Sequence, residues 1–247
     1  DSMKLSEIFT QLSHGELSQM HLGGSGTGII EDAAYDRLVS CINLGLAALH
    51  TRFPIRHGQL TIGFIADKVQ YTIHSKYAET SSSSETKYIL DTASPYLDDL
   101  MKIEKVFTLE GQRLSLNDEA DEYSVSTPSM NTLMVPIDIV NAISGTPEEY
   151  ITTGVAVHYR ASHPYLPAGV GMYRANMVDI DLPYQYLEAL CYFIASRINN
   201  PMGMTNEFHA GNSYAAKYEM ACLALERDNI RVDQVSQPDR IGRNGWV

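Results

Sequence analysis

Apolar residues recur every three to four positions in four segments of the chain, the spacing typical of amphipathic helices. The pattern predicts helices over about residues 4–12, 31–52, 181–198 and 212–227. Local signals agree, because the carboxylates Glu31 and Asp32 open the second helix and Pro54 ends it. In the third helix, Asp181 is the expected N-cap and Pro183 lies in the first turn.

Between the second and third helices the apolar period changes to two, as in half-buried strands. Val69, Tyr71 and Ile73 alternate with polar residues in the clearest case. Strands are predicted over about residues 60–65, 69–73, 87–90, 102–109, 131–135 and 150–159. The expected apolar face of the last strand consists of Ile151, Val155, Val157 and Tyr159. Residues 109–114 predict a tight hairpin turn, and the tract Ser81–Ser84 predicts a polar loop.

These elements predict an α+β fold. A helical bundle formed by the N- and C-terminal helices carries an inserted antiparallel β-rich domain and is followed by an extended C-terminal arm. The terminal helices are expected to pack on one another, because each has a single apolar face to bury. The expected ranges are 1–57 and 179–228 for the helical domain, 58–178 for the insertion and 229–247 for the arm.

Composition and charge restrict the classes of protein to which the chain can belong. The chain has 247 residues, 44% hydrophobic and 19% charged, which is typical of a soluble globular protein. No apolar run approaches the ~20 residues of a membrane helix, and DSMKLSEIF lacks the apolar core of a signal peptide. The net charge of −12 argues against a protein that grips nucleic acid. It does not argue against one that DNA slides past without binding.

The stretch LGGSGTGII, Leu22–Ile30, is the first candidate for chemistry. A P-loop requires Gly-Lys-Ser/Thr at its end, whereas Gly28 is followed by two isoleucines. The dinucleotide motif requires G-x-G-x-x-G, and here the spacing is G-x-G-x-G. The stretch is therefore predicted to be a flexible joint between two helices, and no cofactor is expected.

The metal-ligating residue types lack the spacing of a metal site. His158 and His163 are five positions apart, without a neighbouring cysteine pair or an H-E-x-x-H motif. The histidines are expected to have surface or hydrogen-bonding roles, and no metal is expected. Cys41, Cys191 and Cys222 stand far apart in apolar segments, which predicts buried thiols in a reducing compartment.

The acidic residues give no catalytic pair. Asp98 and Asp99 are adjacent, so their side chains are expected to point apart in a solvated turn. The segment Asn117–Glu122 lacks the glycine and spacing of a calcium loop and is predicted to be an acidic loop. No G-x-S-x-G motif provides a serine nucleophile. The chain is therefore predicted not to be an enzyme.

The C-terminal tail differs in composition from the rest of the chain. After Arg227 the apolar period ends, arginines replace lysines, and the only tryptophan, Trp246, is the penultimate residue. Two interpretations stay open: a disordered tail, or an arm that becomes ordered in a groove of another subunit. Arg and Trp dominate interface hot spots, so the composition of the tail is compatible with the second interpretation, an arm that binds another subunit.

Two segments near the C-terminus carry a family resemblance. Residues 179–199, DIDLPYQYLEALCYFIASRIN, and residues 211–225, GNSYAAKYEMACLAL, resemble the C-terminal helix pair of head-to-tail adaptors of short-tailed bacteriophages. These proteins are also called tail tubular proteins. The early helix YDRLVSCINLGLAALHTRF and the segment MKIEKVFTLEGQRLSLND fit the same scheme. The resemblance covers nearly the whole chain and is one of pattern.

The resemblance implies a structural virion protein without catalysis or cofactor. Adaptors form a ring of twelve copies between the portal vertex and the tail nozzle, and DNA passes through the lumen without specific binding. The ring is assembled in the host cytoplasm and resides in the virion tail. The C-terminal arm is implied to dock on the portal, and by position the docking residues are Arg240, Ile241, Arg243 and Trp246.

Three other classes of protein remain open from the sequence. One is a nozzle or another tail component, because stacked tail rings share helical and β-rich designs. Another is a carbohydrate- or host-surface-binding protein, suggested by 15 tyrosines and a β-rich middle. Tyr186, Tyr192, Tyr214 and Tyr218 have core spacing on helices, however, which favours packing over ligand stacking. The last is an intracellular enzyme without a readable motif.

Overall fold

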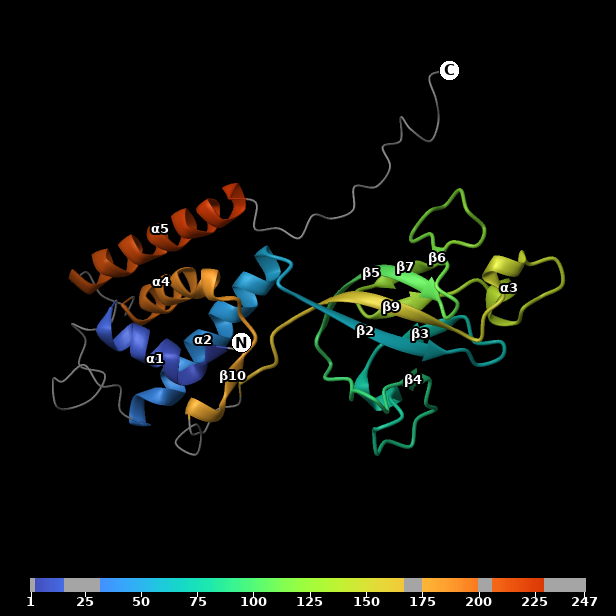
Figure 1. The fold of residues 1–247 in the computed structure, drawn as a ribbon, viewed down its shortest axis with the longest axis horizontal. Helices are drawn as coiled ribbons and strands as arrows, with labels where there is room; N and C mark the ends of the chain where they lie inside the picture. Colours follow the sequence, from blue (N-terminus) through green and yellow to red (C-terminus); the bar gives the residue numbers. More distant parts are fainter. Residues whose placement is uncertain (1–2, 16–31, 167–174, 200–205, 229–247) are drawn as a thin grey trace, which may run out of the picture. The chain divides into compact units, whose positions relative to one another are not determined.

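The chain combines helices with antiparallel sheets, an α+β fold (Figure 1). A computed structural model describes residues 3–15, 32–166, 175–199 and 206–228. The described residues fall into two compact units. The helical unit lies within residues 1–55 and 165–247, and the β unit comprises residues 56–164.

The second unit boundary lies earlier in the chain than the position 178/179 that the sequence suggested. Leu166 is buried in the core of the helical unit. The Asn43 side chain also holds the backbone of Leu166, donating from Nδ2 to its carbonyl at 2.7 Å and accepting from its N–H at 3.0 Å. The chain therefore joins the helical unit soon after its last long strand ends.

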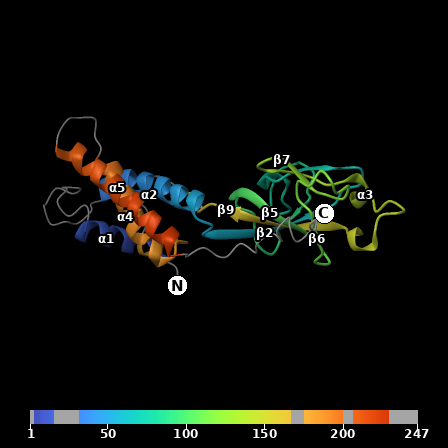
Figure 2. The same ribbon diagram turned by 90° about the horizontal axis from the view of Figure 1, so that it is seen from above.

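The helical unit contains four helices and one short two-stranded sheet among its described residues. Its helices are α1 (Leu5–His14), α2 (Asp32–Arg52), α4 (Leu187–Ile198) and α5 (Asn206–Arg227). Its strands β1 (Met3–Lys4) and β10 (Asp179–Ile180) pair antiparallel. Figure 1 shows α4 between α2 and α5, and in the view from above α5 overlaps α4 (Figure 2). Helix α4 contacts both α2 and α5.

The predicted apolar faces are confirmed for α1, α2 and α4, whereas the predicted stripe of α5 is only partly buried. In α1, Leu5, Ile8, Phe9 and Leu12 are buried, and the predicted stripe of α2 is buried from Leu38 to Leu49. The α4 stripe is buried along its whole length. The prediction that Asp181 is the N-cap is wrong, because a 3₁₀ turn, η5 (Tyr184–Tyr186), precedes α4, and the N-cap residues are Pro183 for η5 and Tyr186 for α4.

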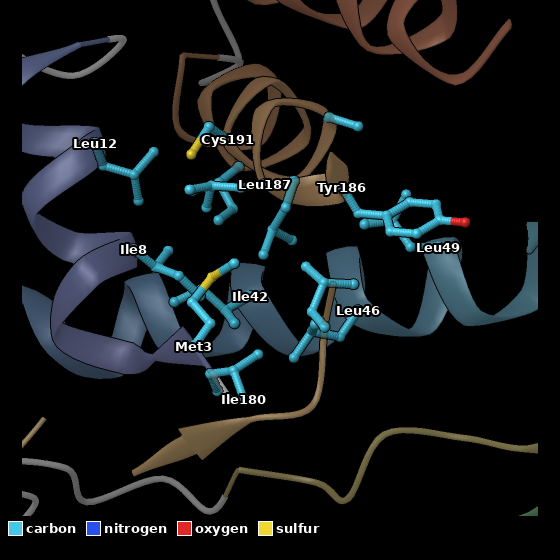
Figure 3. Packing of buried hydrophobic residues seen from close by; sticks show 14 of the residues in the cluster. Met3, Ile8, Leu12, Ile42, Leu46, Leu49, Ile180, Tyr186, Leu187 and Cys191 are labelled. Atoms are coloured by element: carbon cyan, nitrogen blue, oxygen red, sulfur yellow. The ribbon is translucent and has the colours of Figure 1, made fainter. Parts of the chain in front are cut away.

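The core of the helical unit forms where α1, α2 and α4 converge (Figure 3). Ile8 and Leu12 of α1 point toward Ile42 of α2, and Leu187 and Cys191 of α4 close the cluster. Gly45 permits a close approach between α2 and α4. A Cβ at that position would lie 2.6 Å from Leu190 Cδ1 and 3.1 Å from Phe193 Cδ1.

The β unit contains two antiparallel sheets. The five-stranded sheet has the order β4–β2–β9–β5–β6, with β2 (Arg56–Gly63), β4 (Ile89–Leu90), β5 (Leu100–Thr108), β6 (Arg113–Leu114) and β9 (Gly154–Ala161). The three-stranded sheet has the order β3–β8–β7, with β3 (Gln70–Thr72), β7 (Ser126–Ser129) and β8 (Thr132–Met134). The short helix α3 (Ile137–Val140) and the 3₁₀ turns η1 (Ser75–Tyr77) and η2 (Glu148–Tyr150) lie between strands.

The alternation that predicted the strands is confirmed in the core of the β unit. Leu60 and Ile62 of β2 and Val155 and Val157 of β9 are buried on one face of the large sheet. The prediction for Ile151 is wrong, because this residue precedes β9 and is 47% exposed. The predicted turn at residues 109–114 is confirmed: it joins β5 to β6, with Gly111 at a φ of 93°.

Candidate functional site

The arm and the glycine stretch lie outside the described residues. The proposed docking residues Arg240, Ile241, Arg243 and Trp246 fall within residues 229–247, and Leu22–Ile30 falls within residues 16–31. Both therefore stay predictions. The candidate features that can be placed are the acidic residues, the histidines, the cysteines and the helix pair that carries the family resemblance.

Asp98 and Asp99 point apart, as expected, but only Asp98 is solvated. Asp98 is exposed at a φ of 55° and accepts a hydrogen bond from the Ser75 N–H at 2.7 Å. Asp99 is 6% exposed, so the prediction of a solvated turn is wrong for this residue. The physical reason is its partners, because Arg56 and the buried Tyr159 lie on the core face of the sheet and both donate to the Asp99 carboxylate.

Asp99 is the centre of a buried charged cluster. Its Oδ2 accepts from Arg56 Nη1 at 2.7 Å, and its Oδ1 accepts from the Tyr159 hydroxyl at 2.9 Å. Arg56 Nη1 also donates to the carbonyl of Ser162 at 2.9 Å. Burial and the neighbouring Asp99 carboxylate raise the pKa of Tyr159. The cluster holds the beginnings of β2 and β5 against the end of β9, a role in positioning strands.

The histidines do not form a common site among the described residues. His50 is buried and its Nδ1 lies 2.8 Å from the Leu46 carbonyl, while His163 Nδ1 lies 2.7 Å from the Pro164 carbonyl. His158 lies on the outer face of β9, with its ring 5.0 Å from that of Phe107. His14 and His74 are exposed. These positions agree with the predicted surface and hydrogen-bonding roles.

The acidic loop is organised by its own side chains. The Ser115 hydroxyl donates to Asp121, and the Asp118 N–H donates to the Ser124 hydroxyl at 2.9 Å. Tyr123 stacks on Tyr150 with their ring centroids 4.8 Å apart, which brings the loop beside η2. Within the described residues, no three His, Cys, Asp or Glu side chains lie close enough together to hold a metal ion.

The three cysteines, all in the described part of the chain, form no disulfide. Cys191 and Cys222 are buried, as predicted, and Cys41 is half-buried. Burial raises the pKa of both Cys41 and Cys222. Neutral thiols of this kind act as small packing groups.

Across the described helices, none is both long and apolar enough to span a membrane.

The helix pair α4–α5 packs through aromatic side chains. The rings of Phe193 and Tyr218 meet edge to face at 5.3 Å, and those of Tyr192 and Tyr214 lie 6.2 Å apart. Arg52 of α2 joins this pair, because its guanidinium contacts carboxylates of α5. These carboxylates are Glu219, at 2.7 Å, and Glu226, at 2.8 Å. The helix tyrosines thus serve packing, in agreement with their predicted role.

One charged surface was not predicted from the sequence, namely the outer face of the five-stranded sheet. Strand register places Arg160 between His57 and Lys102, and His158 between Gln59 and Lys105. Along β2 and β9 these residues alternate with core residues, so the period of two was a usable signal in those strands. In β5, register shifts between Leu100 and Lys102 and between Ile103 and Lys105 interrupt the period. The order of the strands, which brings the cations together, was not readable from the period.

Comparisons with known proteins add no relative. No protein-family profile matches the chain, and no curated protein is detectably similar to it.

Proposed function

We propose that the chain is a structural virion protein, a head-to-tail adaptor that forms a ring between the portal and the tail nozzle of a short-tailed bacteriophage. The observation that carries the proposal is the interruption of a helical unit by a β unit. Described helices from both ends of the chain belong to one compact unit, and residues 56–164 form the other. This arrangement is the one that the resemblance to adaptors implies.

The segments that resemble adaptors support the proposal through their packing. Residues 187–198 and 206–227 form α4 and α5, which lie against each other through the Phe193–Tyr218 contact. We propose that these helices, with α1 and α2, act as a bundle that carries the insertion. Residues 229–247 then form the extended arm, in which Arg240, Ile241, Arg243 and Trp246 dock on the portal.

The charge of the chain supports a conduit for DNA. A copy carries a net charge of −12, and a ring multiplies that charge around a lumen. Each phosphate contacted by a cation adds salt-dependent affinity, so carboxylates on the lumen wall keep DNA mobile. Screening restricts this effect to about 8 Å at physiological salt, so it concerns only the carboxylates that line the lumen.

A ring of copies binds the portal firmly even when each C-terminal arm binds it weakly. Linked copies bind at a high effective concentration, which multiplies their affinity without new contacts. Deleting Asp239–Val247 is therefore expected to abolish assembly on portal particles while the rest of the chain stays folded. The measurement is co-sedimentation with purified portal particles, with negative-stain images of the bound rings and circular dichroism of the free variant.

A matched control separates the arm from general charge effects. Arg227→Ala removes an exposed arginine at the end of α5, outside the arm, and is expected to leave assembly unchanged. Arg240→Ala and Trp246→Ala together are expected to weaken assembly. Full assembly of the deletion variant would remove the arm from the mechanism, and failure of the unaltered chain to form rings on portals would overturn the proposed function.

A further inference from the structure

The outer face of the five-stranded sheet gathers cations from four strands. Residues that pair directly across antiparallel strands point to the same face. One row joins His57, Arg160 and Lys102, the next joins Gln59, His158 and Lys105, and the last joins Thr61, Ala156, Phe107 and Arg113. The core residues lie on the opposite face. We name the cations Lys102, Lys105, Arg113 and Arg160, with His57 and His158, the basic face.

Three of the cations of the basic face have no carboxylate partner among the described residues. Glu104 approaches it, with Oε2 lying 4.0 Å from His57 Nε2. Within the described part of the chain, no carboxylate forms an ion pair with Lys102, Lys105 or Arg113. The pKa of His158 is lowered, first by burial and then by Lys105 and His57, as expected where positive charge accumulates. This face therefore attracts an anionic partner.

The β unit also carries a surface of opposite, negative charge. Residues 114–159 contain seven carboxylates and neither lysine nor arginine. We name these carboxylates the acidic surface: Asp118, Glu119, Asp121, Glu122, Asp138, Glu148 and Glu149. The Tyr123–Tyr150 stack brings two of the acidic segments together. The pKa of Tyr123 is raised by burial and then by Glu122 and Asp138, which places a third acidic segment nearby.

The two rows of the basic face that contain His158 and Arg160 lie in a different part of the β unit from the acidic surface. Glu148 and Glu149 precede the start of β9 at Gly154, and α3, which carries Asp138, lies toward the same end of the unit (Figure 1). His158 and Arg160, by contrast, belong to the second half of β9. A single copy therefore offers a basic surface and an acidic surface that a neighbouring copy can use at the same time.

We infer that the basic face is the docking surface for the acidic surface of a second copy of this chain. This contact is heterologous, joining unlike surfaces, and such contacts close into rings when the rotation between copies allows it. The inference rests on the proposed function, since it names the contact that joins copies of the ring. A second copy is favoured over nucleic acid because the four cations are embedded in a chain of net charge −12, which repels polyanions.

Charge reversal tests the contact with balanced variants. Lys102→Glu with Arg113→Glu reverses two exposed cations of the basic face, and Glu119→Lys with Glu148→Lys reverses two exposed carboxylates of the acidic surface. Each pair is expected to weaken association between copies by about tenfold or more. Combining both pairs in one chain restores complementarity at the original net charge, and ring formation on portal particles is expected to return.

The control and the readouts separate the possible failures. Lys76→Glu with Arg227→Glu changes the net charge by the same amount at exposed positions outside the basic face and is expected to leave rings intact. Without portals, sedimentation velocity is expected to show that the two reversed variants associate with each other more tightly than either does with itself. This measurement tests the contact even when no ring forms, so its failure is distinct from failure of the adaptor proposal.

Two results overturn the inference. Rings that persist in the Lys102→Glu and Arg113→Glu variant, together with no preferential pairing of the reversed variants, show that the basic face is not the contact. The other is binding of a short fluorescent DNA duplex to the unaltered chain that is lost in this variant and kept in the control, which assigns the face to nucleic acid instead.

Discussion

Gly58 is the position where a single added carbon tests the organisation of the β unit most directly. Gly58 of β2 pairs with Tyr159 of β9, and the Tyr159 ring covers the space where a side chain would stand. A Cβ at Gly58 would lie 2.3 Å from Tyr159 Cζ and 2.5 Å from its hydroxyl oxygen. Gly58→Ala must therefore displace the phenol ring, and with it the hydrogen bond to Asp99.

The expected cost follows from three contributions. Overpacking a well-filled core costs about 1–3 kcal/mol. Weakening a buried hydrogen bond to a charged group, here from Tyr159 to Asp99, adds about 1.5–3 kcal/mol when the bond is lost completely. Replacing glycine by alanine returns about 0.4–1 kcal/mol, because the unfolded chain loses freedom. We expect a net loss of about 2–5 kcal/mol in the free energy of unfolding of the β unit.

The assay is native-state hydrogen exchange of the β9 amides, which reports the unit that contains the substitution. Gly63→Ala is the matched control on the same strand, since its Cβ would lie 3.7 Å from the nearest atom of Leu90, an ordinary contact. It is expected to be neutral or slightly stabilising. Equal protection of β9 in the two variants would refute the reasoning, and so would an undisturbed Tyr159 hydroxyl in the Gly58→Ala protein.

Two further predictions concern the β unit. Tyr88→Phe is expected to lower the free energy of unfolding by about 1–2 kcal/mol, measured by urea denaturation. The reason is that the Tyr88 hydroxyl donates to the Thr72 carbonyl at 2.7 Å and accepts from the Thr72 N–H at 3.1 Å. An unchanged urea midpoint would contradict this expectation. The lowered pKa of His158, caused first by burial and then by Lys105 and His57, means that the unfolded chain binds a proton more readily than the folded chain. Stability is therefore expected to fall as the pH drops below about 6.5, and His158→Gln is expected to flatten that fall in unfolding curves recorded across this range.

The sequence was sufficient to predict those elements that are long enough to show a periodic pattern of apolar residues. Helix α2 spans 21 residues, and its buried stripe emerged from spacing alone. Helix α3 has four residues, about one turn, and carries no measurable period. Strand β7 reads STPS and has no buried residue, because backbone pairing with β8 holds it in place. Elements held by the backbone leave no apolar pattern to read.

The charged features required information that local sequence does not contain. Asp99 was expected in solvent because it is adjacent to Asp98 in a predicted turn. Its burial depends on Arg56, 43 positions away in the chain, and on Tyr159, 60 positions away. The basic face similarly depends on strand order, which places β9 between β2 and β5 although it comes last of the three in sequence. Long-range pairing decides both features.

The pairing of β2 with β9, the strands that begin and end the β unit, has a consequence for how the protein can change during evolution. β2 and β9 are paired along their full lengths, from Arg56 opposite Ala161 to Gly63 opposite Gly154. The first residue of β2 and the last residue of β9 thus lie side by side, so the chain enters and leaves the β unit at neighbouring points, as domain insertions require. A few residues could join these two points in place of the whole unit. Modules of different size can accordingly be exchanged at this point during evolution while the helices keep their own core.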